Sequence, residues 1–437
     1  MSLNNLLFKP VDIAPLAIFR VGFGLLLFLE GVGAVMTGWV QRAFIDPDFT
    51  FSFIPFFPWL QPLPGQGMVY YYILMGVLGA LVMLGWQYRV AITGYFLMWT
   101  LAYWMQKTNY NNHYYLLVLL TGLATMLPAH RYFSMDVRRG SVAKAYYVPN
   151  WTRTVFMLLL WVVYTYAALA KVQSDWLAAK PIAIWFGAKE NTFLVGPLLA
   201  KEWFQYLVAY GGIVFDALII PAIWFRPTRI YALGIALFFH LFNSLVFQIG
   251  IFPYLMLFMS VLFFPPLSVR KFFFARDIAP EPPEAYFYTS FQKKGIMFCW
   301  CVFFLFMLIL PIRHWAYTGD VNWTEEGHRM SWRMMLRSKY GTARFTLVDG
   351  EGNRSSHLPS MDLSGKQALV LPTRPDMIWQ YAQYLKTEYA AKEVYADVKV
   401  SLNGRPLHPF IDPGVDLANE PWRPFKSHPW ILPAPEP

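Results

Sequence analysis

The chain has 437 residues, of which 57% are hydrophobic and 19% aromatic, while only 14% are charged. Soluble domains carry about 25% charged residues, so this composition excludes a disordered chain, a soluble nucleic-acid binder and a typical cytosolic enzyme. The net charge of +10 more often reports orientation than an acidic ligand when the protein lies in a membrane. We therefore expect a polytopic α-helical membrane protein whose surroundings are the lipid bilayer, with no nucleic acid as partner.

Nine apolar segments follow one another along the chain and predict about nine transmembrane helices. A straight crossing needs about 20 apolar residues, so the fourth and eighth segments are short and can be bent or re-entrant. The nine segments lie at residues 14–37, 67–84, 90–105, 113–127, 154–171, 204–225, 229–248, 250–265 and 295–312.

Basic residues are distributed unequally between the loops that join these segments. The loops on the side of the N-terminus hold 14 Lys and Arg residues, whereas the loops on the other side hold 5. The positive-inside rule therefore predicts a cytoplasmic N-terminus and an extracytoplasmic C-terminus. The outer compartment would be the periplasm or extracellular space in a bacterium, or the lumen of the endoplasmic reticulum in a eukaryote.

The chain is predicted to form two parts, a transmembrane helical catalytic domain at residues 1–312 and an extracytoplasmic α/β domain at residues 313–437. The second part carries 15 basic and 14 acidic residues, a balance typical of a soluble domain. Residues 343–348 and 394–402 have the pattern of strands, and residues 376–388 have helical spacing.

Two charged residues, Arg20 and Glu30, lie in the first apolar segment. A charged side chain in the membrane costs about 2.5–3.5 kcal/mol on insertion scales. Ten residues correspond to about 280° of helical rotation, so the two side chains cannot pair with each other. We expect each of them to form a structural ion pair with a partner elsewhere.

The segment from Lys107 to Tyr115 is dense in amides and aromatic rings and contains one imidazole, His113. His113 could exchange a proton with a reacting oxygen, with Asn112 beside it. The alternative is an interfacial aromatic belt in which an asparagine caps the next helix. Composition alone leaves both interpretations open.

Lys171 lies at the outer end of the fifth apolar segment. Tyr164, Ala167 and Ala168 share one helical face with it, and the small side chains on this face allow either close packing or a pocket. Lys171 is therefore either a functional group or a lysine that extends to the lipid headgroups.

His240, Asn243 and Ser244 face one way on the seventh segment. They could contact a ligand or form hydrogen bonds with neighbouring helices.

The two cysteines, Cys299 and Cys301, lie two positions apart on one predicted helix and point away from each other. We therefore expect neither a disulfide nor a cysteine-based metal site, and no metal is expected elsewhere because the sequence has no zinc motif.

Two of these segments resemble vitamin K-dependent γ-glutamyl carboxylase. Lys107-Thr-Asn-Tyr-Asn-Asn-His113-Tyr-Tyr-Leu is similar to one block of that enzyme, and Lys171-Val-Gln-Ser-Asp175-Trp176 is similar to the block that holds its catalytic lysine. The resemblance spans roughly residues 10–430 and includes the bacterial relatives that contain a horizontally transferred transmembrane domain. It continues in order through residues 240–244, 249–254, 331–335, 410–416 and 422–425.

The resemblance implies that Lys171 is an uncharged amine that deprotonates vitamin K hydroquinone. Oxygen then converts the quinol to the 2,3-epoxide through a strongly basic intermediate, which removes a γ-proton from a glutamate of a peptide or protein. The carbanion captures carbon dioxide to give γ-carboxyglutamate, and His113 is associated with this half of the reaction. The implied cofactors are reduced vitamin K or menaquinol, O2 and CO2. Desolvation favours a neutral lysine, which agrees with this role for Lys171.

Further candidate binding residues are His240 and Asn243 in the membrane part and Arg333, Met334 and Met335 in the C-terminal part. The last three combine a fixed cation with adaptable apolar side chains, which suits a site floor that touches a quinone ring and a peptide carboxylate. The alternative is a hydrophobic seam between the C-terminal part and the helices.

Departures from the family pattern leave other functions open. Gln173 replaces the acid found two positions after the lysine, and the disulfide of the animal enzyme cannot form from Cys299 and Cys301. A quinol epoxidase that does not carboxylate protein is one alternative. A membrane acyltransferase would need His113 or His240 but not Lys171, and a transporter or channel would line its pathway with charged residues.

Overall fold

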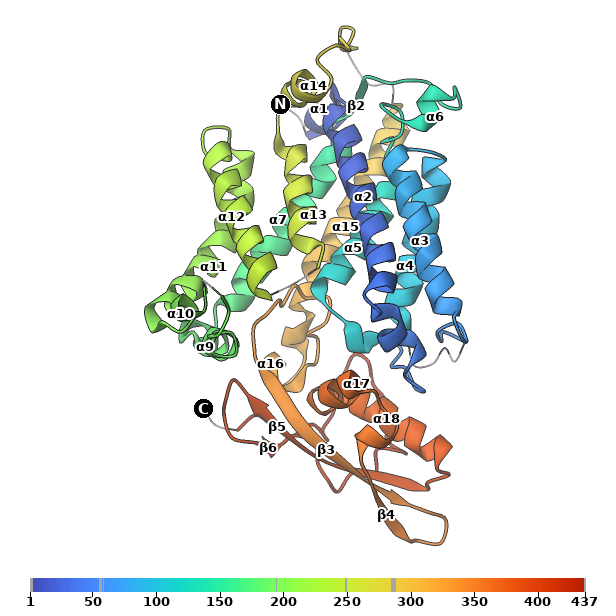
Figure 1. The fold of residues 1–437 in the computed structure, drawn as a ribbon, viewed down its shortest axis with the longest axis vertical. Helices are drawn as coiled ribbons and strands as arrows, with labels where there is room; N and C mark the ends of the chain where they lie inside the picture. The colour runs from blue at the N-terminus through green and yellow to red at the C-terminus, as the bar shows by residue number, and fades with distance from the viewer. Residues whose placement is uncertain are drawn as a thin grey trace.

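The computed structural model describes residues 3–435, apart from residues 55, 56, 58, 194, 248, 249 and 284–287. Long helices stand side by side in a bundle, and the C-terminal part of the chain lies at one end of this bundle (Figure 1). The short N-terminal helix α1 (Leu3–Phe8) lies at the opposite end.

Every apolar segment predicted from the sequence contains a helix of this bundle, although residue 248, the last of the seventh segment, lies outside the described residues. The helices are α2 (Ala14–Met36), α3 (Gly67–Leu84), α4 (Tyr88–Met105), α5 (Asn112–Thr125), α7 (Trp151–Lys171), α11 (Glu202–Trp224), α12 (Arg229–Phe247), α13 (Phe252–Met259) and α15 (Ser290–Ile312).

The structure supports a multi-pass helical membrane protein but does not confirm nine crossings. Six described helices are long and apolar enough to span a membrane: α2, α3, α7, α11, α12 and α15 with its continuation to Ala316. A seventh span is possible where residues 252–263 and α14 (Pro266–Phe273) form a pair bent by 111°. Helix α5 has 14 residues, fewer than a straight crossing needs.

Glycines allow α2 and α3 to approach each other closely. A Cβ atom at Gly31 would lie 2.7 Å from the backbone nitrogen of Gly76, and one at Gly79 would lie 2.5 Å from the backbone nitrogen of Phe28. Small residues at such contacts bring helix backbones together where apolar burial against lipid provides little driving force. Helices α2 and α3 therefore pack with their backbones in close contact at these glycines.

The C-terminal part contains a four-stranded antiparallel sheet with the order β4-β3-β5-β6. The two long strands pair from Lys339 opposite Leu402 to Val348 opposite Glu393. The predicted strands at residues 343–348 and 394–402 belong to these strands, and the helix predicted at residues 376–388 is part of α18. The bounds are β3 (Lys339–Val348), β4 (Arg354–His357), β5 (Glu393–Leu402), β6 (His408–Pro409), α17 (Gly365–Val370) and α18 (Pro375–Glu388).

Ion pairs hold the C-terminal part against the helical bundle. The carboxylate of Asp376 at the start of α18 lies 2.5 Å from Lys107 Nζ and 2.6 Å from Arg329 Nη1. A second contact joins Arg405 Nη1 to Asp175 Oδ2 at 2.6 Å. Both contacts involve segments that adjoin candidate site residues, because Lys107 precedes α5 and Asp175 follows α7.

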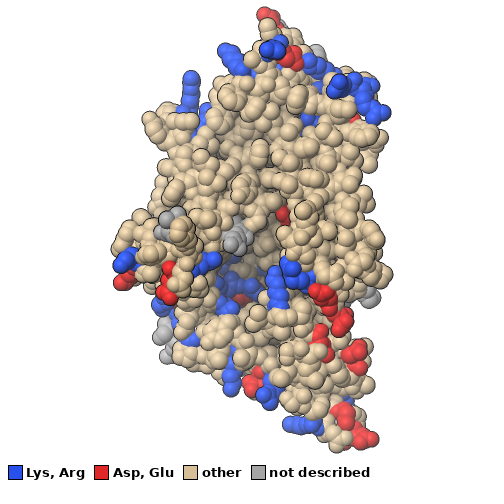
Figure 2. Space-filling model, viewed as in Figure 1, with Lys and Arg blue, Asp and Glu red and all other residues tan. Residues whose placement is uncertain are grey.

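Charged side chains gather at the two ends of the bundle and in the C-terminal part. Figure 2 shows Lys and Arg at both levels, with a belt nearly free of charge between them. This distribution is what a bilayer requires of the side chains that face its hydrocarbon core.

Arg20 and Glu30 do not form the ion pairs that we expected, so this prediction is wrong for the described residues. Arg20 Nη2 donates to the backbone oxygen of Phe133 at 2.5 Å, and Glu30 forms a hydrogen bond with Tyr114. A backbone oxygen and a tyrosine hydroxyl, rather than oppositely charged side chains, are the hydrogen-bond partners of these two residues.

Candidate active site

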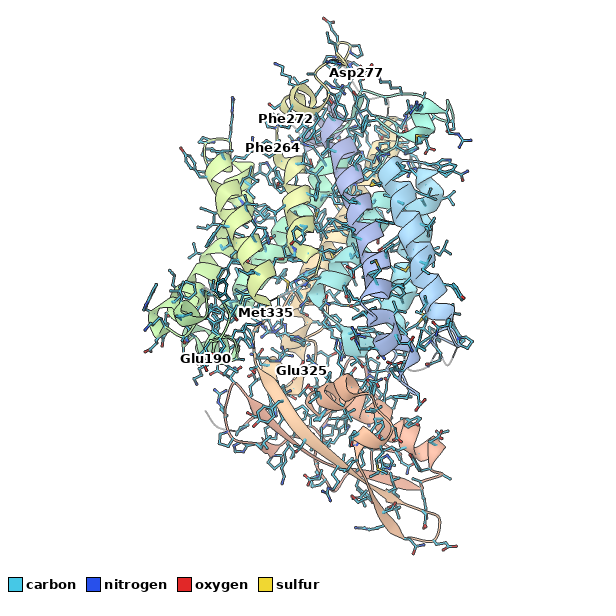
Figure 3. The ribbon with its side chains drawn as sticks, viewed as in Figure 1. Glu190, Phe264, Phe272, Asp277, Glu325 and Met335 are labelled. Carbon is cyan, nitrogen blue, oxygen red and sulfur yellow. The ribbon has the colours of Figure 1, made fainter. Side chains whose placement is uncertain are left out.

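A largely apolar pocket lies where α5, α7, α11, α12 and α13 meet the C-terminal part. Figure 3 shows Met335, one of its lining residues, at this junction. Aromatic and aliphatic side chains form most of the wall. The polar side chains that line it include His113, Tyr164, Lys171, Asp216, His240 and Asn243.

Lys171, the last residue of α7, forms an ion pair with Asp216 of α11 inside this pocket. Lys171 Nζ lies 2.6 Å from Asp216 Oδ2, and the two side chains are 10% and 9% exposed. The ammonium also donates to the backbone oxygen of Ala167 at 3.3 Å. The pair is thus a buried amine and carboxylate that can share or transfer a proton.

Asp216 is a site residue that the sequence analysis did not identify. Its signal was present in the sequence, because Asp216 is an acidic residue in the middle of an apolar segment, and such residues are functional candidates. What the sequence lacks is any sign that Asp216 meets Lys171, since the two residues lie on different helices. Only the packing of α7 against α11 brings them together.

A glycine of α11 leaves room for the lysine side chain. A Cβ atom at Gly212 would lie 4.0 Å from Lys171 Cε and 3.8 Å from the ring of Trp176. A methyl group at position 212 would be in ordinary van der Waals contact with both, so only a side chain larger than that of alanine would press on them. Trp176 closes this side of the pocket, and Lys171 Nζ lies 5.4 Å from the centre of its ring.

Both histidine rings lie next to the ring of Phe252. The His113 ring stacks on the Phe252 ring with centroids 3.8 Å apart, and the His240 ring lies 6.3 Å from Phe252 in an edge-on arrangement. His240 Nε2 also shares a hydrogen bond of 3.1 Å with the Tyr164 hydroxyl. Both imidazoles therefore face the pocket from fixed positions, and Asn243 lines it one helical turn beyond His240.

Asn112 lines a neighbouring polar pocket and binds the segment that separates the two pockets. Its Nδ2 donates to the backbone oxygen of Arg333 at 3.2 Å, and its Oδ1 accepts from the Tyr110 hydroxyl at 2.9 Å. The Tyr110 hydroxyl in turn accepts from the backbone nitrogen of Met330 at 2.5 Å. Asn112 therefore acts on the geometry of the Met330–Met335 segment.

A second set of hydrogen bonds joins the same segment to the residue two positions after Lys171. Arg333 Nη2 donates to Asn322 Oδ1 at 2.9 Å, and Asn322 Nδ2 donates to Gln173 Oε1. Gln173 therefore serves as an acceptor for Asn322, and it connects the end of α7 to the C-terminal part.

The polar pocket is basic and shares His113, Met334 and Met335 with the apolar one. No carboxylate is among its described lining residues, whereas Arg333, Arg337, Lys339 and Arg374 all line it. The carboxylate of Glu325 lies behind the pocket and binds Arg337, Lys339 and Arg374. Figure 3 shows Glu325 on the side of the C-terminal part, beyond Met335.

Burial changes the protonation of two groups in the polar pocket. Desolvation lowers the pKa of Lys339 to about 7, although the charge of Glu325 opposes this shift. Desolvation and the charge of Arg337 hold the pKa of His328 well below its ordinary value. His328 is therefore neutral at pH 7, and the positive charge of the pocket resides mainly on its arginines.

The segment between the two pockets has an unusual backbone. Met330, Trp332 and Met335 have φ values of 58°, 55° and 47°, in the left-handed region that residues with a side chain rarely adopt. Such conformations persist where the surrounding contacts impose them, and they concentrate at functional sites. The hydrogen bond that Asn112 donates to the backbone oxygen of Arg333, and the one that Asn322 accepts from the Arg333 side chain, supply part of this constraint.

The structure thus brings Lys171, His113, His240, Asn243, Met334 and Met335 to one pocket, and places Asn112 and Arg333 at the polar pocket beside it. Cys299 and Cys301 are free and exposed on α15. Within the described residues, no group of three or more His, Cys, Asp or Glu side chains is arranged to hold a metal ion.

The fold and the site define a multi-pass helical membrane protein with a buried amine–carboxylate pair beneath an α/β part. Residues 8–267 match the family model described as HTTM domain, and residues 292–437 match the one described as Vitamin K-dependent gamma-carboxylase, lumenal domain. The chain belongs to the vitamin K-dependent gamma-glutamyl carboxylase family. This family implies reduced vitamin K, O2 and CO2 as cofactors. No solved structure matches the chain.

Proposed function

We propose that this protein oxidises a hydroquinone with O2 and couples the oxidation to the γ-carboxylation of glutamate in a peptide or protein. The observation that carries the proposal is the adjacency of the two pockets. The apolar pocket holds the buried Lys171–Asp216 pair, and the basic pocket shares His113, Met334 and Met335 with it.

The apolar pocket suits a lipid-soluble quinol. Its aromatic wall includes Trp185 and Phe252, which can pack on a flat ring, while His113, His240 and Lys171 supply polar groups for the hydroxyls of that ring. Reduced vitamin K or menaquinol, when bound, would supply with O2 the strong base that a γ-proton of glutamate requires.

Lys171 is the proposed base that accepts the hydroxyl proton of the quinol. Only a neutral amine can accept a proton, and the contact with Asp216 gives the proton of the ammonium a place to go. Transfer from Lys171 Nζ to Asp216 Oδ2 leaves an uncharged amine and an uncharged acid, which removes the cost of keeping two charges out of water. Asp216 is therefore part of the proposed machinery.

The basic pocket is the proposed site for the glutamyl side chain. A γ-carboxylate would meet Arg333 and Arg374 there, and guanidinium groups bind carboxylates through charge-assisted hydrogen bonds. His113 lines both pockets and is the proposed group for the carboxylation half of the reaction. The seam interpretation of Arg333 remains the alternative, because the same side chain also binds Asn322.

We further propose the orientation and the division of the chain. The N-terminus lies in the cytoplasm and the C-terminal part outside it, because the loops at the N-terminal end hold the larger share of Lys and Arg. The transmembrane part comprises residues 1–312, with α4, α5 and the bent pair at residues 252–273 as crossings in addition to the six long apolar helices. A water-soluble substrate would then reach the basic pocket from outside.

The proposal is tested with purified protein in detergent, supplied with vitamin K hydroquinone, O2, labelled bicarbonate and a glutamyl peptide. Quinone epoxide and label on the peptide are measured separately. We expect both products from the wild type and neither from Lys171→Ala. Lys201→Ala, which changes an exposed lysine, is the matched control and should retain both.

The outcomes distinguish the alternatives. Epoxide without label on the peptide would indicate a quinol epoxidase that does not carboxylate protein. Full epoxide formation by Lys171→Ala would contradict the assignment of the base. The absence of both products from a folded wild type, with vitamin K and menaquinol each tried, would favour a transporter or channel.

A further inference from the structure

Arg20 lies near the end of the bundle opposite the C-terminal part and has few partners there. Its side chain is 1% exposed, yet Nε and Nη1 have no hydrogen-bond partner among the described residues. Its third nitrogen, Nη2, donates to the backbone oxygen of Phe133. The charge of Asp136 acts on Arg20 from nearby, but no carboxylate forms a direct ion pair with it among the described residues. Burial of a guanidinium that no carboxylate contacts is unfavourable, so an anion that bound its free nitrogens would stabilise it.

The carboxylates of this region are occupied by other groups. Asp136 accepts from the backbone nitrogens of Gln87 and Tyr88 at 2.7 and 3.1 Å. Asp277 binds Lys144 Nζ at 2.8 Å, and it also accepts from two tyrosine hydroxyls. Neither carboxylate forms an ion pair with Arg20, whose charge therefore lacks a paired carboxylate within the described chain.

Arg20 lines a pocket in which positive charge is in excess. Four cationic side chains and one carboxylate contribute to the lining, and that carboxylate is Asp277, already bound by Lys144. The charged lining residues are Arg20, Arg138, Lys144, Arg276 and Asp277. Figure 2 shows several Lys and Arg side chains at this end of the molecule.

Exposed aromatic side chains surround the same pocket. Phe272 is 81% exposed, Phe133 60% and Phe273 51%, and all three line the pocket. Phe272 and Phe273 end α14, the short helix that follows the 111° bend after residues 252–263. Figure 3 shows Phe272 and Asp277 at this end, far from Met335.

We propose that this pocket binds the phosphate group of an anionic phospholipid. The phosphate would lie against the guanidinium of Arg20, with Arg138 and Arg276 at the rim, and the acyl chains would pack on Phe272 and Phe273. Arginine forms strong charge-assisted bonds to phosphate. Aromatic side chains at the end of a membrane-spanning bundle lie at the boundary of headgroups and acyl chains.

The aromatic rim favours a lipid over a free phosphate ion. Large aromatic groups exposed to water around an ion site would be unfavourable, whereas acyl chains would cover them. The position of the pocket also agrees with a lipid headgroup as the ligand, since Arg20 lies in the second turn of α2, close to the helix end at Ala14. A headgroup at that depth would bring its phosphate to the guanidinium without crossing the hydrocarbon core.

The test measures the melting temperature of delipidated protein in neutral detergent after addition of phosphatidylglycerol, phosphatidylcholine or inorganic phosphate. Native mass spectrometry counts the lipids that remain bound. We expect phosphatidylglycerol to raise the melting temperature by several degrees, because a ligand of the folded state stabilises it, and the other two additives to give a much smaller shift.

Substitutions test whether the rise in melting temperature with phosphatidylglycerol comes from this pocket. Arg20→Met should abolish that rise. Without lipid, Arg20→Met should melt no lower than the wild type, because it removes a buried charge that forms no ion pair. Arg276→Gln changes an exposed rim residue and should require about threefold more lipid for half of the shift. Arg139→Gln lies at the same end but outside the pocket, where it contacts Trp86, and should behave like the wild type.

Each result bears on the proposal. Equal shifts with phosphatidylglycerol and phosphatidylcholine, or an unchanged response of Arg20→Met and Arg276→Gln, would overturn it. A shift produced by inorganic phosphate alone would overturn the assignment to a lipid. If Arg20→Met does not fold, the comparison of Arg276→Gln with Arg139→Gln decides the outcome.

Discussion

Lys171 and Asp216 form a buried ion pair in the apolar pocket. Without Asp216, the ammonium of Lys171 would keep the backbone oxygen of Ala167 as a hydrogen-bond acceptor but would lose its carboxylate. The pair is therefore the part of the site where a single substitution should separate catalysis from folding.

We predict that Asp216→Asn lowers the rate of epoxide formation by about 10²- to 10⁴-fold, the range attributed to positioned proton transfer. Asparagine preserves the shape of the side chain but cannot take up the proton of Lys171. The measurement is kcat for epoxide with saturating quinol. Glu202→Gln, which neutralises an exposed carboxylate on the same helix, serves as the control, and equal rates in the two variants would exclude Asp216 from the mechanism.

Arg333 is the residue at which binding and structural roles can be distinguished. If Arg333 binds a glutamyl carboxylate, Arg333→Ala should raise KM for the peptide by about 10- to 100-fold, because a charge-assisted hydrogen bond contributes about 1.5–3 kcal/mol. The melting temperature should change little. The matched variant Arg344→Ala removes an exposed arginine of β3. A lower melting temperature with unchanged KM would instead identify Arg333 as a seam residue.

At the scale of elements, the helix that follows Lys171 is attached to the turn after β5. Asp175 in α8 (Ser174–Leu177) accepts from Arg405 Nη1 and from Asn403 Nδ2 at 2.6 and 2.7 Å. Burial opposes ionisation of Asp175, but the hydrogen bonds from Arg405, Asn403 and Lys180 outweigh it and lower its pKa to about 2. This attachment holds the C-terminal part beside the end of α7.

The low pKa of Asp175 predicts how stability depends on pH. A carboxyl group whose pKa is lower in the folded state stabilises that state at pH values above its ordinary pKa, and the contribution is lost as the pH falls toward the folded value. We expect Asp175→Asn to lower the melting temperature at pH 7, with the difference from the wild type shrinking between about pH 4 and pH 2. Asp397→Asn, on the exposed face of β5, should show no such difference, and a constant deficit across this range would contradict the assignment.

The close packing of α2 against α3 leads to a second prediction at this scale. Gly31→Leu places a side chain against the backbone of Gly76 and should destabilise the protein by about 1–3 kcal/mol, as overpacking does. Gly33 lies on the same helix, and a Cβ atom there would have nothing within 4 Å, so Gly33→Leu should be tolerated. Comparison of the two melting temperatures tests the packing, and equal values would show that main-chain proximity is unimportant.

At the scale of the whole molecule, the proposed orientation in the membrane can be tested by labelling each end of the protein. We predict that a membrane-impermeant maleimide labels Ser355→Cys on intact cells and does not label Arg139→Cys until the membrane is opened. The native cysteines, Cys299 and Cys301, are first changed to serine because both are exposed. Labelling of Arg139→Cys alone on intact cells would reverse the proposed orientation.

Much of the fold could be predicted because the relevant forces are local. An apolar run of membrane length forms a helix whatever its neighbours are, since its backbone groups have no other partners in lipid. The alternating residues 394–402 identified most of β5 for a similar reason, because side chains point to opposite faces along a strand. Lys171 and His113 also stood out locally, as ionisable groups at the ends of apolar segments.

The partners of these residues could not be predicted, because they depend on how helices pack. Asp216 lies on another helix than Lys171, and Asn112 binds a carbonyl of the C-terminal part. Two nitrogens of Arg20 have no hydrogen-bond partner among the described residues. The spacing of residues in a sequence predicts which side chains share a face of one helix. How two helices are rotated and crossed against each other depends on the fit of many side chains at once. Which charges meet, and which remain unpaired beside a pocket, is therefore a property of the assembled bundle.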